Sequence, residues 1–169
     1  MDASFWKRFE GQWIDRVYYL ERLLGFGAFG GVFLANHVSG KEILRTVAVK
    51  LMLEVRMEEL KQGLNLSHPN LIRCFDAREV RLLDSAFQYL IMELADGTLD
   101  DQLKSGPISA EAALDLGRSL ASVLAHLASG ERRIAHRDLK PANVMRVGDC
   151  WKLSDGGSNF GFRCAGEFR

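Results

Sequence analysis

Short apolar runs dominate the first half of the chain, and they predict a sheet there. Residues 17–24, 32–35 and 47–50 form three such runs, separated by glycine and polar residues. A fourth run, residues 89–97, ends in an Asp-Gly pair, which indicates a buried strand that ends in a turn. Runs of this length and composition are typical of strands. We therefore predict a sheet-rich part that extends to about Met92.

Two other segments have helical patterns. Residues 54–66 predict a helix that stops before Pro69, because proline disfavours helical geometry at the residue before it. Residues 109–128 predict a longer helix with Ser109 as its N-cap. The apolar positions of this longer helix are Ala113, Leu116, Leu120, Val123, Leu124 and Leu127. The chain thus changes from sheet to helix after a hinge that follows Met92.

Residues 1–16 form a short N-terminal lead that is rich in aromatic side chains. Phe5, Trp6, Phe9 and Trp13 lie at helical spacing. Such a stripe can bind a cofactor or a partner, but packing against the sheet-rich part is the simpler interpretation. We therefore expect the lead to cover part of the sheet.

The octapeptide His-Arg-Asp-Leu-Lys-Pro-Ala-Asn at residues 136–143 indicates chemistry most strongly. Asp138 can accept a proton from an attacking hydroxyl, Lys140 can neutralise charge on a phosphoryl group, and Asn143 can hold a magnesium ion. The alternative is a polar turn with a buried, hydrogen-bonded His136. The full set of identities at this spacing disfavours that alternative, and the loop predicts phosphoryl transfer to an alcohol.

A glycine-rich segment at residues 25–32 fits the pattern G-x-G-x-x-G-x-V. Apolar runs flank it on both sides, so the glycines are expected in a hairpin that covers phosphates rather than before a helix that binds a dinucleotide. Glycine allows the backbone to approach a ligand closely. A Walker phosphate loop is excluded, because no Gly-Lys-Ser or Gly-Lys-Thr follows. A plain glycine-rich hairpin is the alternative when this segment is considered alone.

Lys50 ends the apolar run Val-Ala-Val-Lys. A lysine on a buried strand requires an anionic partner that offsets its desolvation. ATP phosphates and a carboxylate of the predicted helix 54–66 can both serve, and Glu59 is our choice for that carboxylate. The alternative is an ordinary surface salt bridge or a lysine whose amino group reaches solvent.

Taken together and in this order, these motifs resemble a eukaryotic-type, bacterial-like serine/threonine protein kinase catalytic domain that is incomplete at its C-terminus. The resemblance implies an α+β, protein-kinase-like bilobal fold, with an antiparallel-sheet N-lobe that has one main helix and a partial helical C-lobe. The implied divisions are a lead at 1–16, the N-lobe and hinge at 17–95, and the partial C-lobe at 96–169. Lys140 favours serine or threonine over tyrosine as the acceptor.

The resemblance also assigns roles to individual residues. It implies ATP and Mg²⁺ as cofactors and serine or threonine hydroxyls of proteins as acceptors. Asp138, Lys140, Lys50 and Glu59 are the implied catalytic residues, and Asn143 and Asp155 are the implied metal ligands. The implied nucleotide-binding residues are Leu24, Gly25, Phe26, Gly27, Ala28, Phe29, Gly30, Val32, Ala48, Lys50, Met92, Glu93, Ala95 and Met145. In this assignment Lys50, Asp138, Asn143 and Asp155 surround a single triphosphate between the two lobes.

Two glycines depart from the family pattern. Gly156 stands where relatives have phenylalanine, and Gly63 stands where they have a large apolar residue that packs on it. We expect a void that lowers stability by about 2 to 5 kcal/mol, unless Phe160 or Phe162 fills it. A nucleotide-binding or scaffolding module without turnover is therefore the rival interpretation. A kinase for an aminoglycoside or choline-like alcohol is disfavoured by Lys140 and Pro141.

Composition adds little to this interpretation. Hydrophobic residues make up 47% and charged residues 26%, which allows a packed core, and the 22 basic residues equal the 22 acidic ones, so net charge indicates neither nucleic acid nor an anionic membrane. Three cysteines without metal-ligand spacing indicate a reduced protein. The first twelve residues lack the apolar core of a signal peptide, and no run of about 20 apolar residues predicts a membrane span. A cytoplasmic location is expected.

The family's Ala-Pro-Glu segment and the helices after it have no counterpart in the sequence. Those helices normally cover the C-lobe. We therefore expect the helix at 112–127 to expose apolar surface and the isolated chain to have low stability.

Overall fold

The computed structural model describes the chain except for residues 28–29, 54–56, 130–132, 155–162 and 165–169. It contains two compact units. The first comprises Met1–Leu64 and Cys74–Leu94, and the second comprises Asn65–Arg73 and Ala95–Arg169. The predicted α+β class, with an antiparallel sheet in the first part of the chain and helices in the second, is confirmed.

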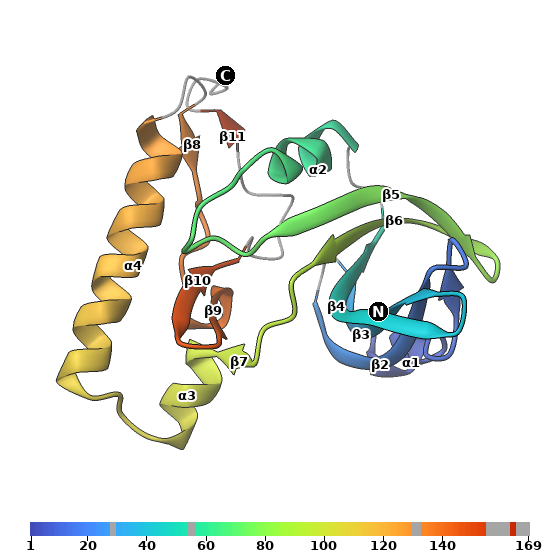
Figure 1. Cartoon of the computed structure of the whole chain (residues 1–169), viewed down its shortest axis with the longest axis horizontal. Helices are drawn as coiled ribbons and strands as arrows, with labels where there is room; N and C mark the ends of the chain where they lie inside the picture. Colours follow the sequence, from blue (N-terminus) through green and yellow to red (C-terminus); the bar gives the residue numbers. More distant parts are fainter. Residues whose placement is uncertain (28–29, 54–56, 130–132, 155–162, 165–169) are drawn as a thin grey trace. The chain divides into compact units, whose positions relative to one another are not determined.

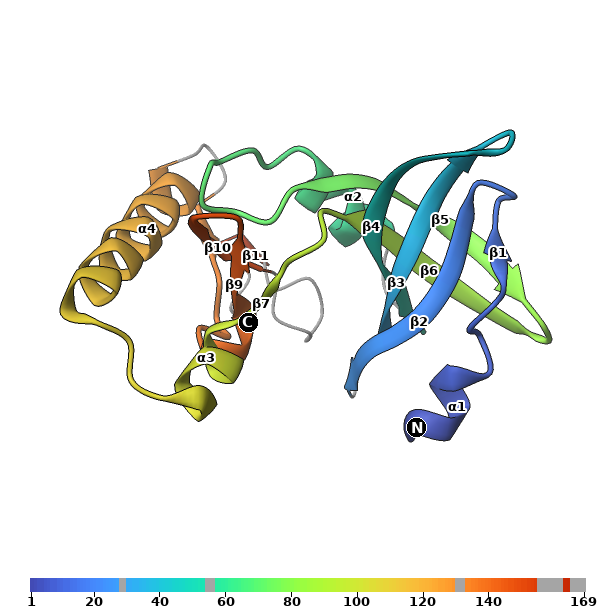
Figure 2. The same cartoon turned by 60° about the horizontal axis from the view of Figure 1, so that its bottom comes forward.

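The first unit is built on a six-stranded antiparallel sheet (Figures 1 and 2). Its elements in chain order are α1 (Ala3–Lys7), β1 (Trp13–Ile14), β2 (Tyr18–Gly27), β3 (Gly30–Ser39), β4 (Glu42–Met52), α2 (Met57–Leu64), β5 (Cys74–Leu82) and β6 (Ser85–Met92). The strands lie in the order β1-β2-β3-β4-β6-β5. Because consecutive strands are joined by short connections, most neighbours in the sheet are also neighbours in sequence.

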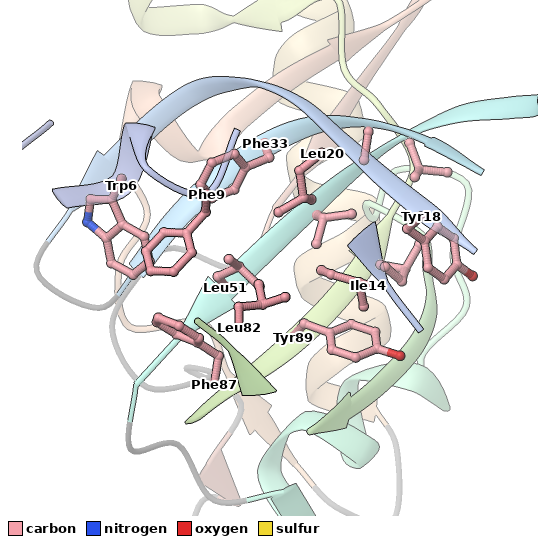
Figure 3. Close-up of a cluster of buried hydrophobic side chains, with 14 residues drawn as sticks. Trp6, Phe9, Ile14, Tyr18, Leu20, Phe33, Leu51, Leu82, Phe87 and Tyr89 are labelled. Atoms are coloured by element: carbon pink, nitrogen blue, oxygen red, sulfur yellow. The ribbon is translucent and has the colours of Figure 1, made fainter. Parts of the chain in front are cut away.

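One face of this sheet carries an apolar core (Figure 3). The core combines alternate residues of the strands with Trp6 and Phe9 of the lead, and it also contains Ile14, Tyr18, Leu20, Phe33, Ala35, Val47, Val49, Leu51, Leu82, Phe87, Tyr89 and Ile91. Phe9 packs edge-on against Phe87, with ring centroids 5.0 Å apart. The expected packing of the lead against the sheet is therefore confirmed for Trp6 and Phe9.

The lead is not one helix, however. Helix α1 ends at Lys7, so only Phe5 and Trp6 of the predicted stripe are helical. Trp13 lies in β1 and is 46% exposed, and its ring contacts Tyr19 rather than the core. The helical spacing was a misleading signal here, because turns and strands can also bring aromatic residues to the same side.

The strands and helix α2 differ from the predictions mainly at their ends. The first three predicted strands are longer in the structure than the apolar runs, because strand pairing continues past each run, through residues 25–27 of β2, 36–39 of β3 and 42–46 of β4. Strand β4 runs two residues beyond Lys50. Helix α2 ends at Leu64, two residues earlier than predicted, and its expected start at 54–56 lies outside the described residues. Strand β6 ends at Met92 and the chain bends at Asp96, but Gly97 already belongs to strand β7 rather than to a turn.

The second unit combines helices with two small sheets. Its elements are β7 (Gly97–Thr98), α3 (Leu99–Ser105), α4 (Ala110–Ser129), β8 (Ile134–Ala135), a 3₁₀ turn (Pro141–Asn143), β9 (Val144–Val147), β10 (Cys150–Leu153) and β11 (Arg163–Cys164). Strands β10, β9 and β7 form one sheet, and β11 pairs with β8 (Figure 1). Backbone hydrogen bonds join Leu153 to Asn70 and Ile72, so the segment Asn65–Arg73 is part of this unit.

Helix α4 is confirmed within one residue at each end. The hydroxyl of Ser109 accepts a hydrogen bond from the Ala112 N–H at 3.1 Å, as an N-cap does. Only Val123 and Leu127 of this helix are buried, and Leu114 is 62% exposed. The expectation that this helix exposes apolar surface is confirmed. Among the described residues, no helix is both long and apolar enough to cross a membrane.

Candidate functional site

The glycine-rich segment forms the end of the β2–β3 hairpin, as the sequence predicts. Gly25 pairs with Val32, and Gly27 pairs with Gly30. A Cβ atom built on Gly25 or Gly27 meets nothing within 4 Å, so both positions have open space beside them. Gly30 is different, because its Cβ would collide with the backbone carbonyl of Leu51. Glycine at that position is required by the close approach of β3 and β4, a reason that the sequence analysis missed.

The register of the sheet brings several predicted nucleotide-binding residues to one face. Val32 lies opposite Lys50, and Ala48 lies opposite Met92. Directly opposed residues in antiparallel strands point to the same side, and so do residues two apart in one strand. The four side chains therefore share a face. Their neighbours Phe33, Val47, Val49, Leu51 and Ile91 belong to the core on the opposite face.

Lys50 is almost fully buried on this face, with 8% of its surface exposed. Its neighbours along β4, from Val47 to Met52, are also buried. A cation in such surroundings is stable only when hydrogen-bonding or anionic groups compensate its desolvation. Glu59, the predicted partner, belongs to α2, but its side chain lies outside the described part of the chain.

Several other predicted residues are distributed along these elements. Leu24 and Phe26 are 41% and 49% exposed on β2, which agrees with an open position near the hairpin end. Glu93 follows β6, Ala95 begins the longer segment of the second unit, and Met145 lies half-buried on β9. Ala28, Phe29 and Asp155 lie outside the described residues, as do Gly156, Phe160 and Phe162.

The segment 136–143 forms a compact polar cluster in the second unit, between β8 and β9 (Figure 1). The Lys140 amino group lies 2.9 Å from Asp138 Oδ2. The Asn143 amide donates to the same oxygen at 3.0 Å and to the Asp138 backbone carbonyl at 2.6 Å. The hydrogen bond from Lys140, helped by that from Asn143, lowers the pKa of Asp138 below its ordinary value. Asp138 is therefore a carboxylate at neutral pH.

Buried hydrogen bonds to Ser154 also hold this cluster in place. His136 is buried, and its Nε2 lies 2.7 Å from the Ser154 carbonyl oxygen. The Ser154 N–H donates to the Asn143 carbonyl at 2.8 Å, and its hydroxyl donates to the same oxygen at 3.2 Å. Ser154 directly precedes Asp155 in the sequence, so these bonds fix the point from which the predicted metal-binding segment starts.

Ser154 is a site residue that the sequence analysis missed. Its only signal was a small polar residue at the end of the apolar strand β10, just before Asp155. Such a residue is compatible with many roles. Its function as a link between His136 and Asn143 depends on contacts across eleven and eighteen residues, which local patterns do not encode.

The polar cluster offers oxygen atoms that suit a hard cation. The Asn143 side chain uses its amide nitrogen for both hydrogen bonds to Asp138, so its carbonyl oxygen is the atom that fits Mg²⁺. Within the described residues, no group of three or more histidine, cysteine, aspartate or glutamate side chains forms a metal site. The predicted second ligand, Asp155, is not among those residues.

Comparison with known proteins gives the same family as the motifs. The model of the protein kinase domain matches residues 18–163. The serine/threonine-protein kinase PrkC of Bacillus subtilis is 27% identical over 147 residues, which are 80% of this chain and 21% of that protein. The serine/threonine-protein kinase PknB of Mycolicibacterium smegmatis is 32% identical over 147 residues, 79% of this chain and 23% of PknB.

A third relative comes from outside the bacteria. The calcium-dependent protein kinase 6 of Plasmodium berghei is 31% identical over 147 residues, 82% of this chain and 10% of that protein. The chain therefore spans less than a quarter of the length of these three relatives. The domain match, by contrast, covers most of the chain, and it includes both the glycine-rich hairpin and the 136–143 cluster. This chain belongs to the protein kinase domain family.

Proposed function

We propose that this chain catalyses phosphoryl transfer from ATP to serine or threonine hydroxyls of protein substrates. Three observations support the proposal: the family, the names of the relatives as serine/threonine-protein kinases, and above all the Asp138, Lys140 and Asn143 cluster. A carboxylate that is ionised and oriented by two donors suits an acceptor for a hydroxyl proton. The proposed use of ATP also favours a cytoplasmic location.

In the first unit, the β2–β3 hairpin and the face of β4 would bind the nucleotide. Gly25 and Gly27 leave space beside the backbone, so their N–H groups can approach phosphate oxygens. Lys50 supplies a buried positive charge beside the apolar side chains of Val32 and Ala48, a combination that suits a phosphate next to a flat base. Met92, opposite Ala48, would limit the depth of the base pocket.

In the second unit, Asp138 would orient the acceptor hydroxyl and receive its proton. Lys140 would neutralise charge that develops on the transferred group. Asn143 fits as a magnesium ligand through its carbonyl oxygen, while its amide nitrogen keeps Asp138 in position. Bound Mg²⁺ supplies charge neutralisation for the phosphates. Positioning and charge, rather than covalent chemistry, would carry the reaction.

The test compares Asp138→Asn with the wild type in two measurements. We expect phosphate transfer to a generic protein substrate to fall by about 10²- to 10⁴-fold, because the proton acceptor is lost. ATP affinity, measured by calorimetry, should stay nearly unchanged. Asp149→Asn is the matched control, because Asp149 also pairs with a basic residue in this unit but is fully exposed. Equal transfer by the Asp138 variant and the wild type would refute the assigned role.

ATP binding without transfer by the wild type would favour a nucleotide-binding module instead. The absence of both binding and transfer would contradict the proposed function as a whole.

A further inference from the structure

We propose that the N-terminal lead clamps the glycine-rich hairpin, and that Glu10 and Trp6 are positioning residues for nucleotide binding. This inference rests on the proposed function. The family match begins at Tyr18, so the clamp uses residues that the family model does not cover. Its contacts all lie within the first unit.

The first arm of the clamp holds strand β2 just before the glycines. The Leu23 N–H donates a hydrogen bond to Glu10 Oε1 at 2.8 Å. The pairing of β2 with β3 shifts register between Leu23 and Gly25, which marks a bulge at Leu24. Strand β1 pairs only with Tyr18 and Tyr19 of β2, so the edge of β2 continues beyond it. The Glu10 side chain therefore binds an edge N–H next to the bulge.

Backbone bonds of the lead reinforce this arm. The Gly11 N–H donates to the Leu20 carbonyl at 2.7 Å, and the Leu20 N–H donates to the Gln12 carbonyl at 2.9 Å. Residues 10–12 thus follow the outer edge of β2 over the stretch that leads into the hairpin end. Since edge groups that are paired cannot fray freely, this contact limits the motion of β2.

The second arm holds strand β3 just after the glycines. The Trp6 ring lies directly against Gly31, where a Cβ atom would be only 2.7 Å from the ring carbons. Trp6 is 1% exposed and is enclosed by Phe5 and Phe87, with ring centroids at 5.1 Å and 5.9 Å. Figure 3 shows Trp6 and Phe9 side by side at one end of the core. The ring therefore has no room to retreat from Gly31.

Glu10 contacts β2 before the loop that is proposed to bind phosphates, and Trp6 contacts β3 after it. A loop whose flanking strands are already fixed loses less conformational entropy when it closes on a ligand. The clamp should therefore raise nucleotide affinity without touching the nucleotide. This effect differs from general stabilisation, because it predicts a change that is local to the hairpin.

The main experiment uses the full chain and the pair Glu10→Ala and Glu10→Gln. Alanine removes the acceptor of the Leu23 N–H, whereas glutamine keeps a side-chain carbonyl oxygen. Hydrogen exchange of residues 18–34 should become about threefold to tenfold faster in the alanine variant, and the dissociation constant of ATP should rise by a similar factor. Glutamine should restore both values. Trp13→Ala is a control, because this aromatic residue of the lead is exposed and contacts Tyr19 instead.

A second experiment tests the Trp6 arm by a double-mutant cycle. Gly31→Ala should weaken ATP binding and speed hairpin exchange in the wild type, because the added methyl group collides with the enclosed Trp6 ring and forces β3 to shift. In Trp6→Leu, the same glycine substitution should have a much smaller effect. Additive effects would contradict the direct contact as the cause.

The results separate this inference from the proposed function. Unchanged hairpin exchange and ATP affinity in Glu10→Ala would overturn the clamp. Equal acceleration of exchange in β5 and β6 would also overturn it, since the role would then be general stability. If the wild type binds no nucleotide, the proposed function fails, while the exchange measurement still tests whether the lead holds the hairpin.

Discussion

The two units hold their candidate residues by different forces. In the first unit, Lys50 lies on a strand whose neighbouring residues pack into an apolar core, and Leu51 next to it is fully buried. In the second, Asp138 lies on a loop that is held by hydrogen bonds from Asn143 and Lys140. Apolar packing is non-directional and depends on area, whereas hydrogen bonds fix orientation at short range.

This contrast predicts different sensitivities. A substitution in the sheet core should alter the stability of the whole unit. The orientation of individual side chains should then depend on how their neighbours repack. A substitution in the polar cluster should alter the geometry of a few atoms, with a smaller change in stability. The polar cluster should also respond to pH, because its bonds depend on charge.

Leu51→Ala should have the largest effect, because it removes a large buried side chain next to Lys50. We expect the free energy of unfolding to fall by about 2 to 5 kcal/mol, which includes the cavity left behind. Urea denaturation followed by circular dichroism measures this loss. Leu83→Ala, at a leucine of the same unit that is 47% exposed, should change stability by less than about 0.5 kcal/mol. Similar losses of unfolding free energy in Leu51→Ala and Leu83→Ala would contradict the idea that apolar packing in the core holds the first unit together.

Asn143→Ala tests the polar side of the comparison. The substitution removes both hydrogen bonds to Asp138, and one of them has a backbone carbonyl as its acceptor. We expect a loss of about 1 to 3 kcal/mol in unfolding free energy. The pKa of Asp138, measured by carboxyl NMR, should rise toward its ordinary value, because a donor to the carboxylate is lost. An unchanged pKa would mean that Lys140 alone orients the group.

Thr98→Ala tests a local polar contact away from the cluster. Thr98 and Asp101 form a capping box at the start of α3, with the Asp101 N–H donating to the Thr98 hydroxyl at 3.1 Å. Removal of the hydroxyl should lower stability by about 1 kcal/mol. Thr98→Ser keeps the hydroxyl and should therefore retain most of the stability that Thr98→Ala loses. The midpoint of urea denaturation measures the stability of both variants. Equal midpoints for the alanine and serine variants would show that the cap contributes nothing to stability.

The sequence predicted those parts of the site that depend on local patterns. The hairpin around Gly25 and Gly27, the strand that carries Lys50 and the helix capped by Ser109 all follow from apolar runs and turn residues. Residue spacing also grouped Asp138, Lys140 and Asn143 correctly, because all three lie within one short segment.

Contacts between distant segments could not be predicted in the same way. Nothing near Ser154 in sequence indicates that it binds His136 and Asn143, and nothing near Gly30 indicates that the backbone of Leu51 excludes a side chain. The extent of α1 was misjudged for a related reason. Phe9 and Trp6 reach the same core because the chain turns after Lys7, and periodicity alone cannot distinguish that turn from a continued helix.

The smallest predicted effect concerns pH and the contact of His68 with α4. Nδ1 of His68 accepts a hydrogen bond from the Asn70 N–H at 3.1 Å, so the neutral ring carries its proton on Nε2, which lies 3.2 Å from the Ser122 hydroxyl. Burial, and to a lesser extent His126 with its ring centroid 5.0 Å away, lowers the pKa of His68. Protonation would also place a hydrogen on Nδ1 and remove the acceptor of the Asn70 N–H.

The sign of the pH effect follows from this lowered pKa. The unfolded chain binds a proton at the ordinary histidine value of about 6.5, whereas the folded chain does so only at lower pH. The stabilisation is therefore complete above the ordinary value and declines as pH falls through it toward the folded-state pKa. Acidification should speed hydrogen exchange in residues 65–73 and 110–129, after correction for the intrinsic rate. In His126→Gln the acceleration should be smaller but not absent, because burial, the larger cause, remains. An identical pH response in the variant would show that the two rings do not interact electrostatically.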